Sequence, residues 1–171
     1  FAFGLGKAAC AMTSAFAEVN SLTDTLVITK HASHLNLVPV TVIEGDHPIP
    51  GSKSLAAGIA AVKFLSRLTQ DDLLVCLISG GGSALMTAPR APIADIQLLT
   101  TELLACGARI DEINLLRRHL DQLKGGGLAR IAVARGARII SLLLSDVVSD
   151  SIETIASGPT AADPSTFEEA L

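Results

Sequence analysis

The sequence predicts an α/β fold: a Rossmann-like, mostly parallel sheet with helices on both faces, which makes three layers. Short runs of aliphatic and β-branched residues alternate with longer Ala-rich or amphipathic segments, and this alternation is typical of right-handed βαβ units. Half of the chain (49%) is apolar, yet it has five Phe, no Trp and no Tyr, and an aliphatic core favours close packing of helices on a sheet. Glycine-bearing turns stand at three of the expected junctions between elements.

The expected strands are short, and the expected helices have apolar residues at helical spacing. Strands are predicted at residues 1–5, 25–29, 38–43, 73–78 and 138–144, and helices at residues 7–19, 55–68, 93–105, 110–120, 128–134 and 166–171. Ser52 or Ser54 can cap the second helix, and Gly107 ends the third as a C-cap. The inward faces are expected to consist of Leu55, Ile59, Val62 and Leu65 in one helix and of Ile110, Ile113, Leu116 and Leu120 in another.

The composition excludes some classes of function and suggests a compartment. A net charge of −4 and few aromatic side chains provide neither a basic surface nor a stacking platform for nucleic acid. No apolar run approaches the ~20 residues of a membrane-spanning helix. Cys10, Cys76 and Cys106 lie far apart in apolar stretches. We therefore expect three buried thiols in a reducing cytoplasm rather than disulfides or a metal site.

The length of 171 residues suits one domain, and no internal repeat or linker divides it. The chain begins inside an expected strand and stops inside an expected helix. We therefore expect residues 1–171 to be truncated at both ends. The oligomeric state stays open, with a homodimer among the alternatives.

The first glycine turn is the most informative feature of the chain. It follows an expected buried strand and precedes helix-forming residues, and it consists of Ser79, Gly80, Gly81, Gly82 and Ser83. Three successive glycines remove the Cβ atoms that would keep a ligand away from the main chain. Free backbone N–H groups at such a turn attract an anion, most often phosphate. The alternative is a plain tight turn, and the Gly-Lys-Ser/Thr of a Walker A loop is absent.

The second glycine turn has a lysine in front of it. In one interpretation, Lys124 contacts a phosphate while Gly125 and Gly126 let the main chain approach the ligand. In the other, the turn is a helix C-cap followed directly by a new helix.

Two further sets of charged residues are candidates for the same site. Lys7 follows a glycine at the first strand-to-helix turn, where a cation opposes the helix dipole unless an anion is bound nearby. Asn114 and Arg117 (or Arg118) share a helix face with Asp121. Such a face is usually solvated, but an arginine directed into the crevice at the strand ends would bind a carboxylate or phosphate bidentately.

Asp146 and Asp150 follow the last apolar strand. A carboxylate in this position can hold Mg²⁺ in nucleotide enzymes or take a proton from a substrate hydroxyl. The alternative is that Asp146 caps a turn and Asp150 starts the next helix.

His31 and His34 have a spacing that metal ligands use, but a third ligand is not evident, so we expect an exposed loop. His47 lies in a proline-rich loop that either walls a pocket or merely connects two elements.

Taken together, these residues resemble the glycerate 2-kinase family. The matching stretches run in the family's order over almost the whole chain: Gly4–Ala9, His47–Pro50, Leu77–Leu85, Gly107–Ile110, Asn114 with Arg117–Leu120, Lys124–Gly126, Ser145–Val147 with Asp150, and Ile155–Thr160. The resemblance implies a Rossmann-like N-terminal domain that works with a smaller C-terminal domain of the same protein. It also implies ATP- and Mg²⁺-dependent phosphorylation of D-glycerate at the 2-hydroxyl.

The resemblance also suggests a role for each candidate residue. The turn at 79–83 would cradle phosphate, Lys7 and Lys124 would neutralise the transferring group, and Gly125 and Gly126 would adjoin it. Asn114 and Arg117 would orient substrate oxygens. Asp146 and Asp150 would hold Mg²⁺ or activate the 2-hydroxyl.

This chain departs from the family at three positions. Asp121, Gly127 and Ser149 stand where the family usually has Ser, Arg and Gly. Asp121 near a phosphate would repel it unless Arg117 or Lys124 compensates its charge.

The sequence leaves two other functions open. One is a non-catalytic domain that binds an anion or a nucleotide. The other is hydroxypyruvate reduction, a label that some relatives have. The chain lacks the nicotinamide-binding fingerprint, because Gly4-Leu-Gly6 is followed by Lys7-Ala-Ala9.

Overall fold

A computed structural model describes residues 1–36, 39–145 and 151–170. In this part of the chain the strands form one sheet in the order β3-β2-β1-β4-β5, and every pair of neighbours is parallel. The strands are β1 (Ala2–Leu5), β2 (Thr25–Thr29), β3 (Thr41–Glu44), β4 (Leu73–Ser79) and β5 (Arg138–Leu144). The predicted α/β fold is thereby confirmed, and the carboxyl ends of all these strands meet at one edge of the sheet.

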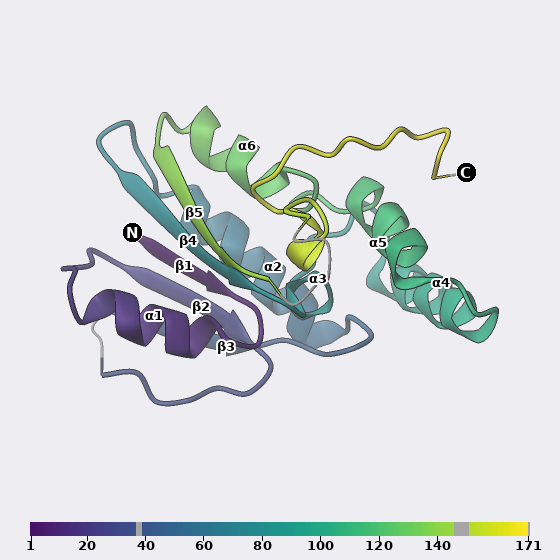
Figure 1. Cartoon of the computed structure of the whole chain (residues 1–171), viewed down its shortest axis with the longest axis horizontal. Coiled ribbons are helices and arrows are strands. Elements are labelled where there is room, and N and C mark those ends of the chain that lie inside the picture. Colours follow the sequence, from purple (N-terminus) through teal and green to yellow (C-terminus); the bar gives the residue numbers. More distant parts are fainter. Residues whose placement is uncertain (37–38, 146–150, 171) are drawn as a thin grey trace.

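Helices cover both faces of the sheet and complete the three layers (Figure 1). Helix α1 (Ala9–Ala17) packs on one face, whereas α2 (Ser52–Leu65) and α6 (Gly127–Ala134) contact each other and cover the opposite face. Gly4 lets α1 lie close to β1, because a Cβ there would stand 2.8 Å from Thr13 Oγ1. No helix among the described residues is long and apolar enough to cross a membrane.

The remaining helices gather beyond the carboxyl edge of the sheet. They are α3 (Gly82–Leu85), α4 (Ile93–Ala105), α5 (Ile110–His119) and the short 3-10 helix η1 (Ile155–Ser157). In Figure 1, α4 and α5 form a pair to the right of the strand ends, and η1 lies between them and the sheet. The segment after η1 passes over α5, where Arg118 Nε donates a 3.0 Å hydrogen bond to Asp163 Oδ1.

The inward face of α2 differs from the predicted one. Ile59 is 61% exposed, and the buried positions include the small residues Ala57, Gly58 and Ala61. A Cβ on Gly58 would stand 1.9 Å from the carbonyl oxygen of Thr87. Small residues let this helix approach the neighbouring loop closely, so the larger aliphatic side chain turns outward.

Other expectations about burial and helix ends were also wrong. Ile110, the first residue of α5, is 65% exposed. Cys106 is exposed at the end of α4, where its thiol donates to the carbonyl of Leu103, whereas Cys10 and Cys76 are buried as expected. Residues 167–170 form turns rather than the predicted helix.

Candidate functional site

A cavity of about 230 Å³ opens at the carboxyl edge of the sheet. Its walls come from the turn after β1, the turn after β4, the loop after β3, helix α5 and the segment around η1. The lining residues are Lys7, His47, Pro48, Gly80, Gly81, Ser83, Ala84, Ile110, Asn114, Arg117, Thr154 and Ala156. Parallel sheets bind ligands at this edge, and six of the predicted site residues meet here.

The first glycine turn presents unpaired main-chain amides to this cavity. Within the described residues, the N–H groups of Gly81, Gly82 and Ser83 have no hydrogen-bond acceptor. Gly81 has a φ of +86°, in the left-handed region that favours glycine. A Cβ there would stand 3.0 Å from Lys7 Cε, so the missing side chain leaves room for the lysine beside the turn. Gly81 and Ser83, whose amides are free, therefore border the same cavity as Lys7.

Two residues of this turn, Ser79 and Gly82, have structural roles. The Oγ atom of Ser79 accepts a 3.0 Å hydrogen bond from the amide of Ala8 and so fixes the turn after β1. Gly82 is packed so tightly that a Cβ would stand 2.7 Å from that of Ala156. Helix α3 has only four residues, so the attraction for an anion comes from local amides rather than from the dipole of a long helix.

Arg117 joins the cavity from α5. Its Nη2 donates a 3.3 Å hydrogen bond to the carbonyl of Pro48. Its Nε is buried and has no partner among the described residues, and burial lowers the pKa of this guanidinium. A buried N–H donor normally has an acceptor, and this one has none among the described residues.

A chain of buried hydroxyl groups orients Asn114. Ser157 Oγ donates to Ser83 Oγ over 2.7 Å, and Ser83 Oγ donates to Asn114 Oδ1 over 3.0 Å. Because the amide oxygen of Asn114 is the acceptor, its NH₂ group is left to donate to a ligand. Ala156 and Ser157 have positive φ values of 53° and 60°, a backbone conformation that costs energy for residues other than glycine.

The second glycine turn is built differently. The amides of Gly125 and Gly126 donate to the carbonyls of Ser157 and Gly158 over 3.0 Å and 2.7 Å. Lys124 is buried, and its ammonium donates to Asp121 Oδ2 and to the carbonyl of Met86 over 2.6 Å and 2.8 Å. None of these three predicted residues lines the cavity, so the structure does not bring them together with the first turn.

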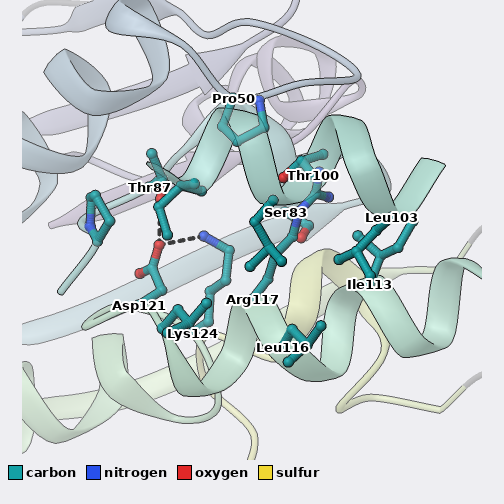
Figure 2. Close-up of a pocket in the computed structure, with 14 residues that line it drawn as sticks. Pro50, Ser83, Thr87, Thr100, Leu103, Ile113, Leu116, Arg117, Asp121 and Lys124 are labelled. Carbon is teal, nitrogen blue, oxygen red and sulfur yellow. Dashed lines mark hydrogen bonds and ion pairs between the residues drawn. The ribbon is translucent and has the colours of Figure 1, made fainter. Parts of the chain in front are cut away.

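Asp121, where the family usually has Ser, is paired with a buried lysine. Figure 2 shows Asp121 between Thr87 and Lys124, with both interactions dashed. Burial raises the pKa of Asp121, but the Lys124 ammonium and the hydrogen bonds from Thr87 and Leu123 outweigh it and hold the pKa below its ordinary value of 3.8. Asp121 is therefore compensated by Lys124. The space drawn in Figure 2, between α4 and α5, measures only about 10 Å³ and is too small for a substrate.

Two contributors to the site could not be predicted from the sequence. Ser157 lies in the third glycine turn (Ile155–Thr160), but nothing local indicates that its hydroxyl reaches Ser83, 74 residues away. For His47, the sequence indicates only a loop that either walls a pocket or connects two elements. A lone histidine in a proline-rich loop was the available signal, and the structure places it in the cavity wall.

Asp146 and Asp150, the predicted metal ligands, lie outside the described residues. Within the ranges that the structure describes, no group of three His, Cys, Asp or Glu side chains could hold a metal ion.

Comparison with known proteins shows which family the chain belongs to. A profile described as "Domain of unknown function (DUF4147)" matches residues 1–171. The chain belongs to the DUF4147 family. It is 44% identical, over 99% of its length, to the glycerate 2-kinase of Pyrococcus horikoshii. A crystal structure of glycerate kinase from Thermotoga maritima superposes with a TM-score of 0.90 at 36% identity, covering 99% of this chain.

The DUF4147 chain spans less than half of these relatives: 38% of the Pyrococcus protein and 42% of the Thermotoga chain. It is also 39% identical, over 98% of its length and 44% of the relative's, to an Agrobacterium vitis protein labelled a hydroxypyruvate reductase. The resemblance drawn from the motifs is confirmed. The two labels among relatives leave the reaction of this chain to be tested.

Proposed function

We propose that this chain is the part of a glycerate 2-kinase that binds the reacting groups, and that the full-length protein transfers the γ-phosphoryl group of ATP to the 2-hydroxyl of D-glycerate. One observation carries the proposal. The cavity at the sheet edge is lined by Lys7, by Arg117 and by Gly81 and Ser83, whose amides are free, in a chain 44% identical to a glycerate 2-kinase.

The described residues fit the phosphate groups of ATP. Phosphoryl transfer depends on positioning and on neutralisation of charge rather than on covalent chemistry by the protein. The amides of Gly81, Gly82 and Ser83 would bind phosphate oxygens, and Lys7 would neutralise their charge. The NH₂ group of Asn114 and the guanidinium of Arg117 would orient the carboxylate and hydroxyl oxygens of glycerate.

The described residues alone do not provide a magnesium site. The described residues contain no cluster of metal ligands, so Mg²⁺ would be held by Asp146 and Asp150 together with the phosphates. Mg²⁺ commonly uses one or two carboxylates in this way.

The second glycine turn has a supporting role in this proposal. Lys124, Gly125 and Gly126 would hold the third turn, and through it Ser157, in place. The relatives are more than twice as long as this chain, so we expect another domain of the same protein to close over the cavity and exclude water. Free thiols at Cys10, Cys76 and Cys106 support a cytoplasmic location.

The test is an assay of ATP-dependent phosphorylation of D-glycerate by the full-length protein, with product position assigned by NMR. Formation of 2-phosphoglycerate is the expected result. Oxidation of NADH with hydroxypyruvate, followed at the absorbance of the reduced cofactor, would instead support the reductase label. If neither reaction occurs but ATP binds, the protein is a nucleotide-binding module.

A single substitution connects the assay to the cavity. Lys7→Ala removes an exposed side chain that has no hydrogen bond or ion pair with a described residue, so stability should change by less than about 0.5 kcal/mol. Turnover should fall about 100-fold or more, because charge on the transferring group loses a stabilising cation. Unchanged turnover would remove Lys7 from the site.

A further inference from the structure

His47 occupies a distinctive position in the cavity wall. It stands over the first glycine turn, because a Cβ on Gly81 would lie 3.5 Å from His47 Cδ2. Lys7 and Arg117 line the same cavity. The imidazole is therefore next to the amides and the lysine that would bind the transferring phosphate, and it shares the cavity with the arginine that would bind the acceptor.

The loop that holds His47 is fixed on both sides. Before it, the amide of Asp46 donates to Ser54 Oγ over 2.9 Å, and Asp46 Oδ2 accepts from the amide of Lys53 over 3.0 Å. After it, the carbonyl of Pro48 accepts from Arg117 Nη2. These contacts bind the backbone and the neighbouring carboxylate, but no described residue forms a hydrogen bond with the imidazole. Its ring nitrogens are therefore left for a ligand.

The surroundings favour the neutral form of this imidazole. Burial lowers the pKa of His47 below its ordinary value of 6.5, and the charges of Lys7, Lys30 and Arg117 lower it further. These cations come from the turn after β1, from the end of β2 and from α5. The carboxylate of Asp46 faces the amides of α2 instead. At neutral pH the ring therefore keeps an unprotonated nitrogen that can accept a proton.

We propose that His47 is the general base that takes the proton from the acceptor hydroxyl in this cavity. The inference rests on the proposed function, because the acceptor is a hydroxy acid and the donor a nucleoside triphosphate. The O–H bond breaks as the proton passes to the ring nitrogen. The oxygen's electron pair forms the bond to the terminal phosphorus, and the bond from this phosphorus to the bridging oxygen breaks, leaving its electrons on the diphosphate.

No other described side chain around the cavity is as suited to this task. Arginine is always protonated, asparagine cannot accept a proton on its NH₂ group, and a lysine ammonium is a donor. Asp146 and Asp150 are the bases that the sequence predicts, and the test below compares them with His47.

The test compares variants in the full-length protein. His47→Gln keeps a hydrogen-bonding side chain but cannot take a proton at pH 7. We expect kcat to fall about 100-fold or more, within the usual contribution of a general base, while the KM for glycerate changes by less than about 3-fold because binding contacts persist. His34→Gln is the matched control, since His34 is exposed and does not line the cavity. Added imidazole should restore part of the activity of His47→Ala, which a merely structural role would not allow.

The pH profile gives an independent readout. The base must be neutral, so kcat/KM should fall as pH decreases through the pKa of His47, which lies below 6.5. We call this fall at low pH the acidic limb of the profile. Bound anionic substrates favour the imidazolium and raise the pKa of His47, so the acidic limb of kcat should lie at higher pH than that of kcat/KM. Both limbs should disappear in His47→Gln.

Each outcome decides a different question. Failure of the wild-type protein to phosphorylate glycerate overturns the proposed function and this inference with it. An active wild type whose His47→Gln variant keeps its turnover and its acidic limb overturns only the role of His47. Loss of that limb in an Asp146 or Asp150 variant instead moves the role to the carboxylate. If the His47 variants do not fold, a wild-type profile without an acidic limb below pH 6.5 overturns the inference.

Discussion

The two triple-glycine turns of this chain have similar sequences and opposite structural roles. At residues 80–82 the glycines leave amides unpaired beside a cavity and beside an exposed lysine. At residues 125–127 the first two amides donate to the third turn, and the preceding lysine is buried in an ion pair. A glycine cluster therefore indicates only that another group packs closely against the main chain. What approaches it, a ligand or another loop, depends on contacts from elsewhere in the chain.

The largest effect should come from the lysine of the second turn. Lys124→Met leaves the carboxylate of Asp121 buried without its cation, and breaking a buried pair in this way typically costs about 3–5 kcal/mol. Urea denaturation of the full-length protein measures the loss. The matched double variant Asp121→Asn/Lys124→Met should recover part of it, since neither charge remains.

The opposite outcome would give Lys124 a role at the ligand. If Lys124→Met abolished turnover while the unfolding midpoint stayed near that of the wild type, Lys124 would act on the ligand as the sequence suggested. The second turn would then be a ligand site too.

Alanine substitutions at one glycine of each turn test whether the two turns differ in function. Gly81 and Gly126 have nearly equal φ values, +86° and +78°, and a Cβ on either would have its nearest contact at 3.0 Å. Alanine should therefore cost each turn about 1–2 kcal/mol of backbone strain. The Cβ at position 81 meets Lys7 Cε, whereas that at position 126 meets the carbonyl oxygen of Ala161.

We expect both alanine variants to lose stability and only Gly81→Ala to lose ligand binding. The KM of this variant for the proposed substrates, ATP and D-glycerate, should rise about 10-fold or more, because the new methyl group displaces Lys7 and intrudes on the amides. Steady-state kinetics beside thermal denaturation separates the two effects. Equal kinetic losses in both variants would contradict the division of roles between the turns.

Most of the fold could be predicted because it follows from local patterns. The observed bounds of α4 (Ile93–Ala105) and β5 (Arg138–Leu144) coincide with the predicted ranges. Pro92 and Gly107 flank the helix, and an unbroken aliphatic run marks the strand. The orientation of α2 could not be predicted this way, because its inward face is set by the close approach of a distant loop to Gly58.

The site was predictable in its residue types but not in its pairings. Helical spacing placed Asn114, Arg117 and Asp121 on one face, yet the structure separates their tasks: two line the cavity and the third pairs with Lys124. The contact between Ser83 and Asn114 joins residues 31 positions apart. Spacing along a helix does not indicate which distant residue a side chain contacts. The hydrogen-bond partners of these polar groups can therefore be assigned only from the folded structure.

Ser157 connects the two glycine turns, and its substitution should have the smallest effect. Its carbonyl accepts from the amide of Gly125, while its hydroxyl donates to Ser83. Ser157→Ala removes only the second contact, so the cost should be about 1 kcal/mol, typical of one hydrogen bond. Thermal denaturation measures it, with exposed Ser66→Ala in α2's C-terminal cap as the control.

The kinetic effect of Ser157→Ala should be confined to the first turn. Without its donor, Ser83 Oγ can rotate away from Asn114 Oδ1, and the amide of Asn114 loses its fixed orientation toward the cavity. We therefore expect the KM for glycerate to rise severalfold, whereas the contacts of Gly125 and Lys124 persist because they use main-chain atoms and Asp121. An unchanged KM together with a large loss of stability would mean that Ser157 serves the packing of the second turn rather than the ligand. The hydroxyl chain would then be a structural link, and the contrast between the turns would rest on their amides alone.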